Sequence, residues 1–228
     1  LDNNYINLNV AEIKFQGELK WKPIKPLELS LMGASRFQQS GQQHYIKDQS
    51  NQALAYRAMP TIFVRDSNPL LYKDPSDQYA VPGTILPSGG IYNRTDYQIL
   101  TRDFRFTAAF DKIFADVHKI YAFTGAELNA VDRNYNWFRG WGLQYDLGEI
   151  PFVDYRLFKN NQEQGLQYYE VSNTRSRQAA FYGLANYTYD NRYTVNGTVR
   201  YEGTNRLGRS RSARWLPTWN IAGLWTVS

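Results

Sequence analysis

The chain has 228 residues, of which 43% are apolar and 21% charged, values typical of a chain that folds. It contains no Cys and only two His, which excludes disulfide scaffolds and cysteine nucleophiles and leaves little for histidine chemistry. The net charge of +5 is too mild to indicate nucleic acid by itself. The longest run of apolar residues and Gly, Ala179–Ala185, is too short for a membrane helix, which needs about 20 residues.

Residues 11–22 alternate strictly between two kinds of side chain. The odd positions from Ala11 to Trp21 are apolar or small, whereas the even positions from Glu12 to Lys22 are all charged or polar. A period of two places the two sets on opposite faces of a β-strand, whereas a helix would scatter the charges around its axis. This segment is therefore predicted to be a strand with one apolar and one polar face.

The same alternation recurs downstream and predicts seven strands in all. The clearest pair runs from Ala179 to Tyr187 and from Tyr193 to Tyr201, joined by the turn residues around Asp190. The predicted strands cover residues 4–22, 27–36, 98–110, 117–127, 177–189, 193–202 and 218–227.

Strand length and loop length indicate the fold class. Soluble strands average about five or six residues, but most of these are about twice as long, the length of a tilted membrane strand. Tight turns at one end and long loops at the other are typical of outer-membrane barrels. We therefore predict an all-β fold, a segment of an antiparallel transmembrane β-barrel with short periplasmic turns and long extracellular loops. The long connections are residues 37–97, 128–176 and 203–216.

The face pattern alone also fits a soluble β-sandwich or a lipocalin-like barrel with one buried face, so length and loop asymmetry decide between the classes. A bacterial outer-membrane barrel normally has an even number of strands, and an open sheet would expose two edges to hydrocarbon. We therefore expect residues 1–228 to be part of a larger barrel whose remaining strands lie outside this stretch.

Three motifs carry a family resemblance. Residues 187–193 read Tyr-Thr-Tyr-Asp-Asn-Arg-Tyr, residues 199–208 read Val-Arg-Tyr-Glu-Gly-Thr-Asn-Arg-Leu-Gly, and residues 215–225 read Trp-Leu-Pro-Thr-Trp-Asn-Ile-Ala-Gly-Leu-Trp. Together they resemble the barrel of SusC/RagA-type TonB-dependent transporters of Bacteroidota. The resemblance covers residues 177–227 and extends to the hairpin at 98–127.

The resemblance implies import across the outer membrane and no enzymatic chemistry. Members of this family form a large barrel that is filled by an N-terminal plug and capped by a SusD-like surface lipoprotein, which captures oligosaccharides or peptides. The TonB–ExbB–ExbD system supplies energy through the plug. For this chain the resemblance implies an outer-membrane location, contact with membrane lipid and lipopolysaccharide, and a plug domain outside residues 1–228.

If the apolar faces meet lipid, the polar faces line the barrel interior. Their charges are of mixed sign, which suits a surface that packs through ion pairs and water. We hypothesise that these side chains hold the plug or line the permeation path. The predicted interior residues are Glu12, Lys14, Glu18, Lys20, Asp103, Arg105, Arg200 and Glu202.

Cargo specificity is expected in the long loops, where aromatic side chains offer platforms for a ligand. Each of these side chains is equally able to pack its own loop, and the sequence leaves the cargo open between a glycan and a peptide. The candidate ligand-binding residues are Tyr45, Tyr56, Tyr79, Tyr92, Trp137 and Trp141.

The remaining charged residues of the loops are assigned no catalytic role. Loop carboxylates such as Asp74 and Asp77 are taken as solvated acids, because nothing places them at the separation that glycoside hydrolysis needs. A loop-bound calcium is a hypothesis, since oxygen ligands are plentiful, and no other metal or cofactor is expected. A basic run beside Trp215 is interpreted as an exposed loop that faces lipopolysaccharide or an acidic partner, not nucleic acid. That run comprises Arg206, Arg209, Arg211 and Arg214.

Two other classes of protein stay open as alternatives. One is a soluble carbohydrate-binding or hydrolytic β-domain, which should purify from the aqueous fraction without detergent. The other is a passive structural or secretion-associated outer-membrane barrel, which would have no plug and no TonB box.

Overall fold

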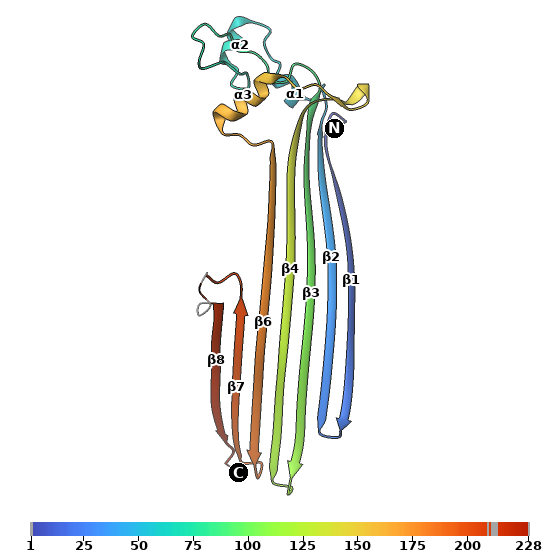
Figure 1. Cartoon of the computed structure of the whole chain (residues 1–228), viewed down its shortest axis with the longest axis vertical. Helices are drawn as coiled ribbons and strands as arrows, with labels where there is room; N and C mark the ends of the chain where they lie inside the picture. Colours follow the sequence, from blue (N-terminus) through green and yellow to red (C-terminus); the bar gives the residue numbers. More distant parts are fainter. Residues whose placement is uncertain (1, 209, 211–213, 228) are drawn as a thin grey trace. The chain divides into compact units, whose positions relative to one another are not determined.

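Long antiparallel strands make up most of the chain, in agreement with the predicted all-β class. The computed structural model describes residues 2–208, 210 and 214–227. Within these residues the sheet has the order β1-β2-β3-β4-β6-β7-β8, with the short β5 paired to β4 (Figure 1). The strands are β1 (Asn4–Ile24), β2 (Leu27–Ile46), β3 (Gly90–Phe114), β4 (His118–Gln144), β5 (Ile150–Pro151), β6 (Tyr169–Tyr189), β7 (Tyr193–Thr204) and β8 (Trp215–Trp225).

Tight turns join β1 to β2, β3 to β4 and β6 to β7. In the turn between β3 and β4, Ala115 and Asp116 both have positive φ angles, of 45° and 57°. Asp190 and Asn191 do the same between β6 and β7, at 47° and 53°. Two consecutive left-handed residues give the twist that matches a tight antiparallel hairpin, and Asp and Asn tolerate that conformation well.

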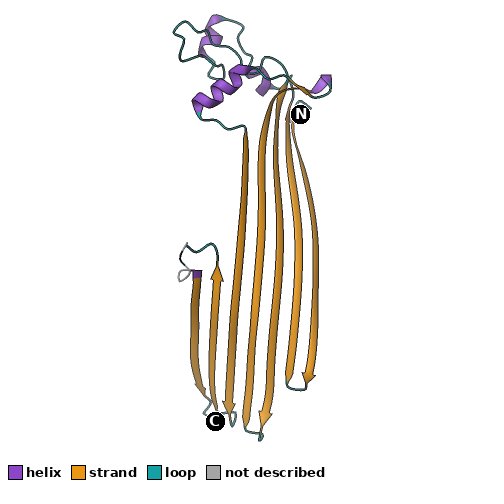
Figure 2. Ribbon diagram, viewed as in Figure 1, coloured by secondary structure: helices purple, strands orange, loops and turns teal. Residues whose placement is uncertain are grey.

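Two of the longer connections, residues 47–89 and 145–168, contain short helices that were not among the predicted elements (Figure 2). They are α1 (Asn51–Ala55), α2 (Ile62–Ser67), the 3-10 helix η1 (Tyr145–Leu147) and α3 (Tyr155–Gln164). Side-chain oxygens of Ser50, Thr61 and Asp154 accept backbone N–H bonds at the N-termini of α1, α2 and α3, and Gly165 ends α3 at a φ of 64°. In the described part of the chain, no helix has the length and hydrophobicity to cross a membrane.

Four strands extend beyond their predicted limits, away from the tight turns. β2 ends at Ile46 instead of residue 36, and β4 ends at Gln144 instead of residue 127. β3 begins at Gly90 instead of residue 98, and β6 at Tyr169 instead of residue 177. The loops are correspondingly shorter than predicted, at residues 47–89, 145–168 and 205–214.

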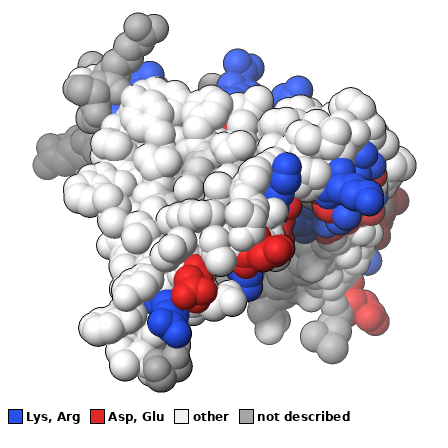
Figure 3. Space-filling view, turned by 90° about the horizontal axis from the view of Figure 1, so that it is seen from below, with Lys and Arg blue, Asp and Glu red and all other residues white. Residues whose placement is uncertain are grey.

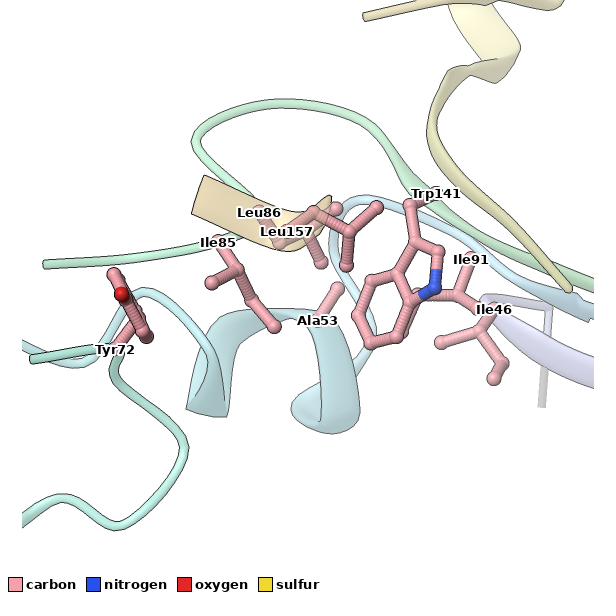
Figure 4. Close-up of a cluster of buried hydrophobic side chains, with 8 residues drawn as sticks. All are labelled: Ile46, Ala53, Tyr72, Ile85, Leu86, Ile91, Trp141 and Leu157. Atoms are coloured by element: carbon pink, nitrogen blue, oxygen red, sulfur yellow. The ribbon is translucent and has the colours of Figure 1, made fainter. Parts of the chain in front are cut away.

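The chain divides into two compact units, each built from three segments. The loop unit comprises Leu1–Ala11, Gln39–Gln98 and Asn134–Asn173, and the strand unit comprises the rest of the chain. The loop unit has a small core of buried side chains, gathered from strand ends and loops (Figure 4). That core consists of Ile46, Ala53, Tyr72, Ile85, Leu86, Ile91, Trp141 and Leu157.

The strand unit exposes large apolar side chains in place of burying them. Phe15 on β1 is 72% exposed, and Trp219 and Ile221 on β8 are 75% and 71% exposed. Alternation places these residues on the face opposite the charged side chains. Figure 3 shows acidic and basic side chains next to one another in a band, beside a broad surface without charge.

Candidate functional site

A cavity of about 220 Å³ in the loop unit brings together residues from distant segments. Pockets that enclose a whole small molecule are usually about 300–1,000 Å³, so this cavity suits one side chain or one sugar ring of a longer ligand. Its walls combine aromatic, amide and guanidinium groups with aliphatic side chains. The lining residues are Tyr56, Pro69, Leu70, Leu71, Ile85, Arg139, Trp141, Asn160, Asn161, Gln164, Leu166 and Gln167.

Trp141 forms the aromatic wall of this cavity, and it is only 8% exposed. Tyr56 packs edge-on against its ring, with centroids 5.3 Å apart at 90°. The guanidinium carbon of Arg139 lies 5.8 Å from the Trp141 ring centroid, and its Nε donates to Oδ1 of Asn93 at 2.7 Å. Figure 4 shows the Trp141 ring beside Ile91 and Ile46, so packing fixes the ring in place.

Helix α3 supplies the amide wall. Asn160 and Asn161 are 7% and 6% exposed, although both side chains are polar. Gln164 at the end of the same helix also lines the cavity. Aromatic and amide groups can stack on a ligand and offer it both donors and acceptors, as peptide groups and sugar hydroxyls require.

Two polar contacts hold α3 against the preceding connection. Lys159 forms an ion pair with Asp74, and the Tyr72 hydroxyl donates to the Glu163 carboxylate at 2.9 Å. The hydrogen bond from Lys159, followed by those from Ser76, holds the pKa of Asp74 down at about 2. Burial, followed by the hydrogen bond to Glu163, raises the pKa of Tyr72. Lys159 and Glu163 flank Asn160 and Asn161 along the helix, so these contacts position the cavity wall.

The structure corrects the location of four predicted ligand-binding residues. Tyr45 lies on β2, Tyr92 on β3, and Trp137 and Trp141 lie on β4, although all four were predicted in loops. The extension of these strands past their predicted ends explains the difference. Only Trp141 of the four lines the cavity described above.

The two remaining candidates do lie in loop 47–89, where they were predicted. Tyr56 caps α1 and lines the cavity beside Trp141. Tyr79 is 86% exposed and lies apart from the cavity lining. The six candidates therefore do not form one aromatic platform.

Tyr45 and Tyr92 belong to a separate tyrosine cluster in the loop unit. The Tyr45 ring stacks on Tyr5 with centroids 5.0 Å apart, and it contacts Tyr92 at 5.2 Å and Tyr145 at 6.1 Å. The Tyr145 hydroxyl donates to the backbone oxygen of Ile91 at 3.0 Å. This cluster ties strand ends together, which is a packing role.

The predicted interior residues lie on the polar face of the strand unit, and most engage neighbouring side chains there. Arg36 pairs with Glu12 at 2.8 Å, and Ser30 donates to Glu18 at 2.8 Å. Lys20 lies 3.5 Å from Glu18, and alternation along β1 places Lys14 on the same face.

The same pattern continues on the strands farther along the sheet. Asn129 donates to Asp103 at 2.5 Å, and Arg105 pairs with Glu127 at 2.8 Å. Arg200 pairs with Glu202 at 2.6 Å. The polar face is thus laced by pairs of opposite charge.

A second cavity, of about 260 Å³, opens on this polar face. It is lined by Glu127, Arg200 and Glu202 among others. Beside it the Tyr182 ring lies over Gly125, where a Cβ would come within 2.5 Å of the ring, and its hydroxyl donates to Glu127 at 3.2 Å. Gly125 therefore allows the close approach of the tyrosine.

Several residues of the first cavity were missed by sequence reasoning. Arg139, Asn160 and Asn161 carry no motif, although the sequence does hold the signal for their helix. Asp154 as a capping residue and Gly165 as a terminator bracket α3, and together they could have revealed it.

The structure also bears on the calcium hypothesis and on the basic run beside Trp215. Within residues 2–208, 210 and 214–227 there is no group of three or more acidic or His side chains that could hold a metal ion. Of the basic run, Arg206 and Arg214 are described, whereas Arg209 and Arg211 lie outside the described residues.

Comparison with solved structures shows the fold. The RagAB peptide importer in its closed-closed state matches with a TM-score of 0.68 and 14% identity, over 99% of this chain and 20% of that chain. The RagAB peptide transporter matches with a TM-score of 0.68, and the importer in its open-open state with a TM-score of 0.67. Both are 15% identical in sequence, and both matches cover 98% of this chain and 20% of the other chain. This chain therefore spans about one fifth of the length of the chains it matches. No sequence family model and no curated protein matches it.

Proposed function

We propose that this chain is a segment of a TonB-dependent outer-membrane barrel that imports an oligosaccharide or a peptide together with a SusD-like surface lipoprotein. The observation that carries the proposal is the two-faced strand unit. One face exposes aromatic and aliphatic side chains, and the other bears paired charges. A soluble sheet would cover its apolar face with other parts of the protein, whereas a membrane strand turns that face to lipid.

The fold likeness and the motif resemblance support the same proposal independently. The likeness rests on the arrangement of the strands and reaches chains of a peptide importer. The resemblance rests on the sequence of residues 177–227 alone. Transport by such a barrel requires no covalent chemistry from its side chains, so the proposal includes no catalytic residue.

In this proposal the strand unit and the loop unit have different roles in import. The polar face of the strand unit lines the barrel interior, where its charge pairs hold the plug or border the permeation path. The loop unit contacts cargo through the cavity that Trp141, Tyr56 and the amide side chains of α3 line together. The plug, which contacts TonB, and the remaining strands belong to other parts of the protein.

Fractionation of the source cells tests the location. An antibody against residues 47–89, the longest connection between strands, should detect the protein in the outer membrane, as a heat-modifiable band well above 26.5 kDa. Recovery of a 26.5 kDa band from the aqueous fraction without detergent would contradict the proposal and favour a soluble β-domain.

Energy dependence separates an importer from a passive barrel. If the protein imports actively, deletion of TonB should abolish growth on its cargo while leaving the amount of protein in the outer membrane unchanged. Growth that persists without TonB would favour the passive barrel.

A further inference from the structure

A charged cluster interrupts the apolar face of the strand unit. Arg102 donates from Nη2 to Oδ2 of Asp132 at 2.9 Å, and Arg177 donates from Nη2 to Oδ1 of the same carboxylate at 2.5 Å. Alternation along β3 places Arg102 on the face of Phe104, and alternation along β6 places Arg177 on the face of Phe181. Three charged side chains thus lie together on the side that bears aromatic and aliphatic residues.

The cluster lies at the end of the apolar face that is farther from the tight turns. Arg102 lies twelve positions before Phe114, where β3 ends, and Arg177 lies twelve positions before Tyr189, where β6 ends. At about 3.3 Å per residue and a strand tilt of about 40°, this corresponds to roughly 30 Å along the membrane normal. The apolar band of outer-membrane barrels is about 25 Å tall, so the cluster falls at the height of the lipid headgroups.

Aromatic side chains mark the same boundary. The Trp215 ring stacks on Tyr201 with centroids 4.8 Å apart and lies 6.4 Å from Phe181. It covers Gly203, where a Cβ would come within 2.5 Å of the ring, so this close approach requires glycine. Aromatic girdles occur where hydrocarbon meets headgroups. Arg214 precedes Trp215 and therefore lies at that level.

A groove of about 630 Å³ opens at the cluster. The side chains of Arg102 and Arg177 are 56% and 42% exposed, whereas the Asp132 side chain is only 22% exposed. The lining includes three arginines and Asp103, and Asp132 pairs with two of those arginines, so three guanidinium groups face two carboxylates and positive charge is in excess. The groove residues that matter here are Phe104, Leu128, Trp215, Arg102, Arg177 and Arg214.

We propose that this groove binds a phosphate-bearing lipid of the outer leaflet, with an acyl chain along its apolar wall and the headgroup phosphate on Arg102, Arg177 and Arg214. The inference rests on the proposed outer-membrane location. Guanidinium groups bind phosphate through charge-assisted, often paired hydrogen bonds. A lipid supplies both the apolar and the anionic chemistry that the groove presents, whereas a free anion matches only the charged wall.

Asp132 holds Arg102 and Arg177 in position in the absence of lipid. Two guanidinium groups side by side repel each other, and a carboxylate between them holds both in place. Because one negative charge faces two positive ones, the assembled cluster still attracts an anion. Asp132 is therefore a positioning residue.

Native mass spectrometry of the detergent-solubilised protein, purified whole from the outer membrane, tests the inference. The probes are lipid A with both phosphates, the same lipid after enzymatic dephosphorylation, and inorganic phosphate. We expect the dephosphorylated lipid to bind at least about tenfold more weakly, since charge-assisted hydrogen bonds to phosphate are lost. Displacement of phosphorylated lipid by millimolar inorganic phosphate would overturn the inference in favour of a free-anion site.

Matched variants separate the cluster from general charge effects. Arg102→Gln with Arg177→Gln should weaken binding of phosphorylated lipid A about tenfold or more. Arg105→Gln with Arg200→Gln removes two arginines of similar exposure, 50% and 45%, from the polar face, and should leave lipid binding unchanged. Asp132→Asn keeps both arginines but loses the carboxylate that positions them, so binding of phosphorylated lipid A should weaken while binding of the dephosphorylated lipid stays unchanged. Unchanged binding of phosphorylated lipid A would contradict the positioning role.

The outcomes distinguish this inference from the proposed function. A protein recovered without detergent would overturn both. An outer-membrane protein that binds the two forms of lipid A equally, or whose two double variants lose lipid equally, would overturn the inference alone.

Discussion

Two polar side-chain contacts decide how firmly the cavity wall of α3 is held. Lys159 reaches Asp74, and Glu163 accepts from Tyr72, so both anchors join the helix to residues 72–74. Exposed ion pairs are individually weak because water screens them. Here they flank the two buried asparagines, and their loss would loosen the wall without unfolding the sheet.

The pH dependence of these anchors follows from the two pKa shifts. The pKa of Asp74 is lowered to about 2, so its contribution is complete above about pH 4 and is lost as the pH falls toward 2. The pKa of Tyr72 is raised, so its contribution is complete below about pH 10 and is lost at higher pH. We expect hydrogen-exchange protection of α3, corrected for the intrinsic rate, to fall roughly twofold or more between pH 4 and pH 2.

Asp74→Asn provides the control for the acid limb. This variant cannot form the ion pair at any pH, so protection of α3 should be lower at pH 7 and should change little between pH 4 and pH 2. An acid-induced loss equal to that of the wild type would assign the effect to other carboxylates.

At the scale of the strands, the sequence predicts the faces well and the ends poorly. Alternation is clear in residues 11–22 because one face is apolar and the other charged. The added part of β2, residues 37–46, is rich in Gln and polar on both faces, so it carries no such signal. If the strands rise above the membrane there, both faces meet water, and the physical cause of alternation is gone.

Strand faces can be tested by arginine substitutions at two depths. Ala108 lies six residues from the end of β3, near the middle of the proposed apolar band, so Ala108→Arg should cost about 2–4 kcal/mol of folding free energy in a bilayer. Phe104 lies near the headgroups, so the charge introduced by Phe104→Arg should cost only about 0–1 kcal/mol of folding free energy. Folding titrations of the whole protein into vesicles measure both.

Thr107→Arg is the matched control, because Thr107 is next to Ala108 but on the polar face. It should be tolerated. Equal destabilisation by Thr107→Arg and Ala108→Arg would mean that both faces are buried in protein, as in a soluble sandwich. If Phe104→Arg destabilised the protein more than Ala108→Arg, the apolar band would lie at a different height from the one proposed here.

At the scale of the whole molecule, the cavity illustrates what sequence reasoning cannot reach. Its walls come from segments near residues 56, 70, 140 and 164, and only the folded chain brings these together. Composition drew attention to loop-unit aromatics, among them Trp141 and Tyr56, which line the cavity. It could not separate these from Tyr45, which packs on other tyrosines, because an aromatic side chain in a ligand site and one in a core have the same sequence signature.

Blocking the cavity tests whether it serves cargo. Gln164→Trp places a large ring at the end of α3, where Gln164 lines a space of only about 220 Å³. Gln162→Trp adds the same ring to the same helix at an exposed position away from the lining. If the cavity holds one unit of the cargo chain, Gln164→Trp should raise the KM for import of the peptide or oligosaccharide about tenfold, at equal surface amounts of protein. Gln162→Trp should import like the wild type, because the surface of α3 alone would then be uninvolved. Equal KM values for the two variants would remove the cavity from the import path and leave the polar face of the strand unit as the remaining cargo surface.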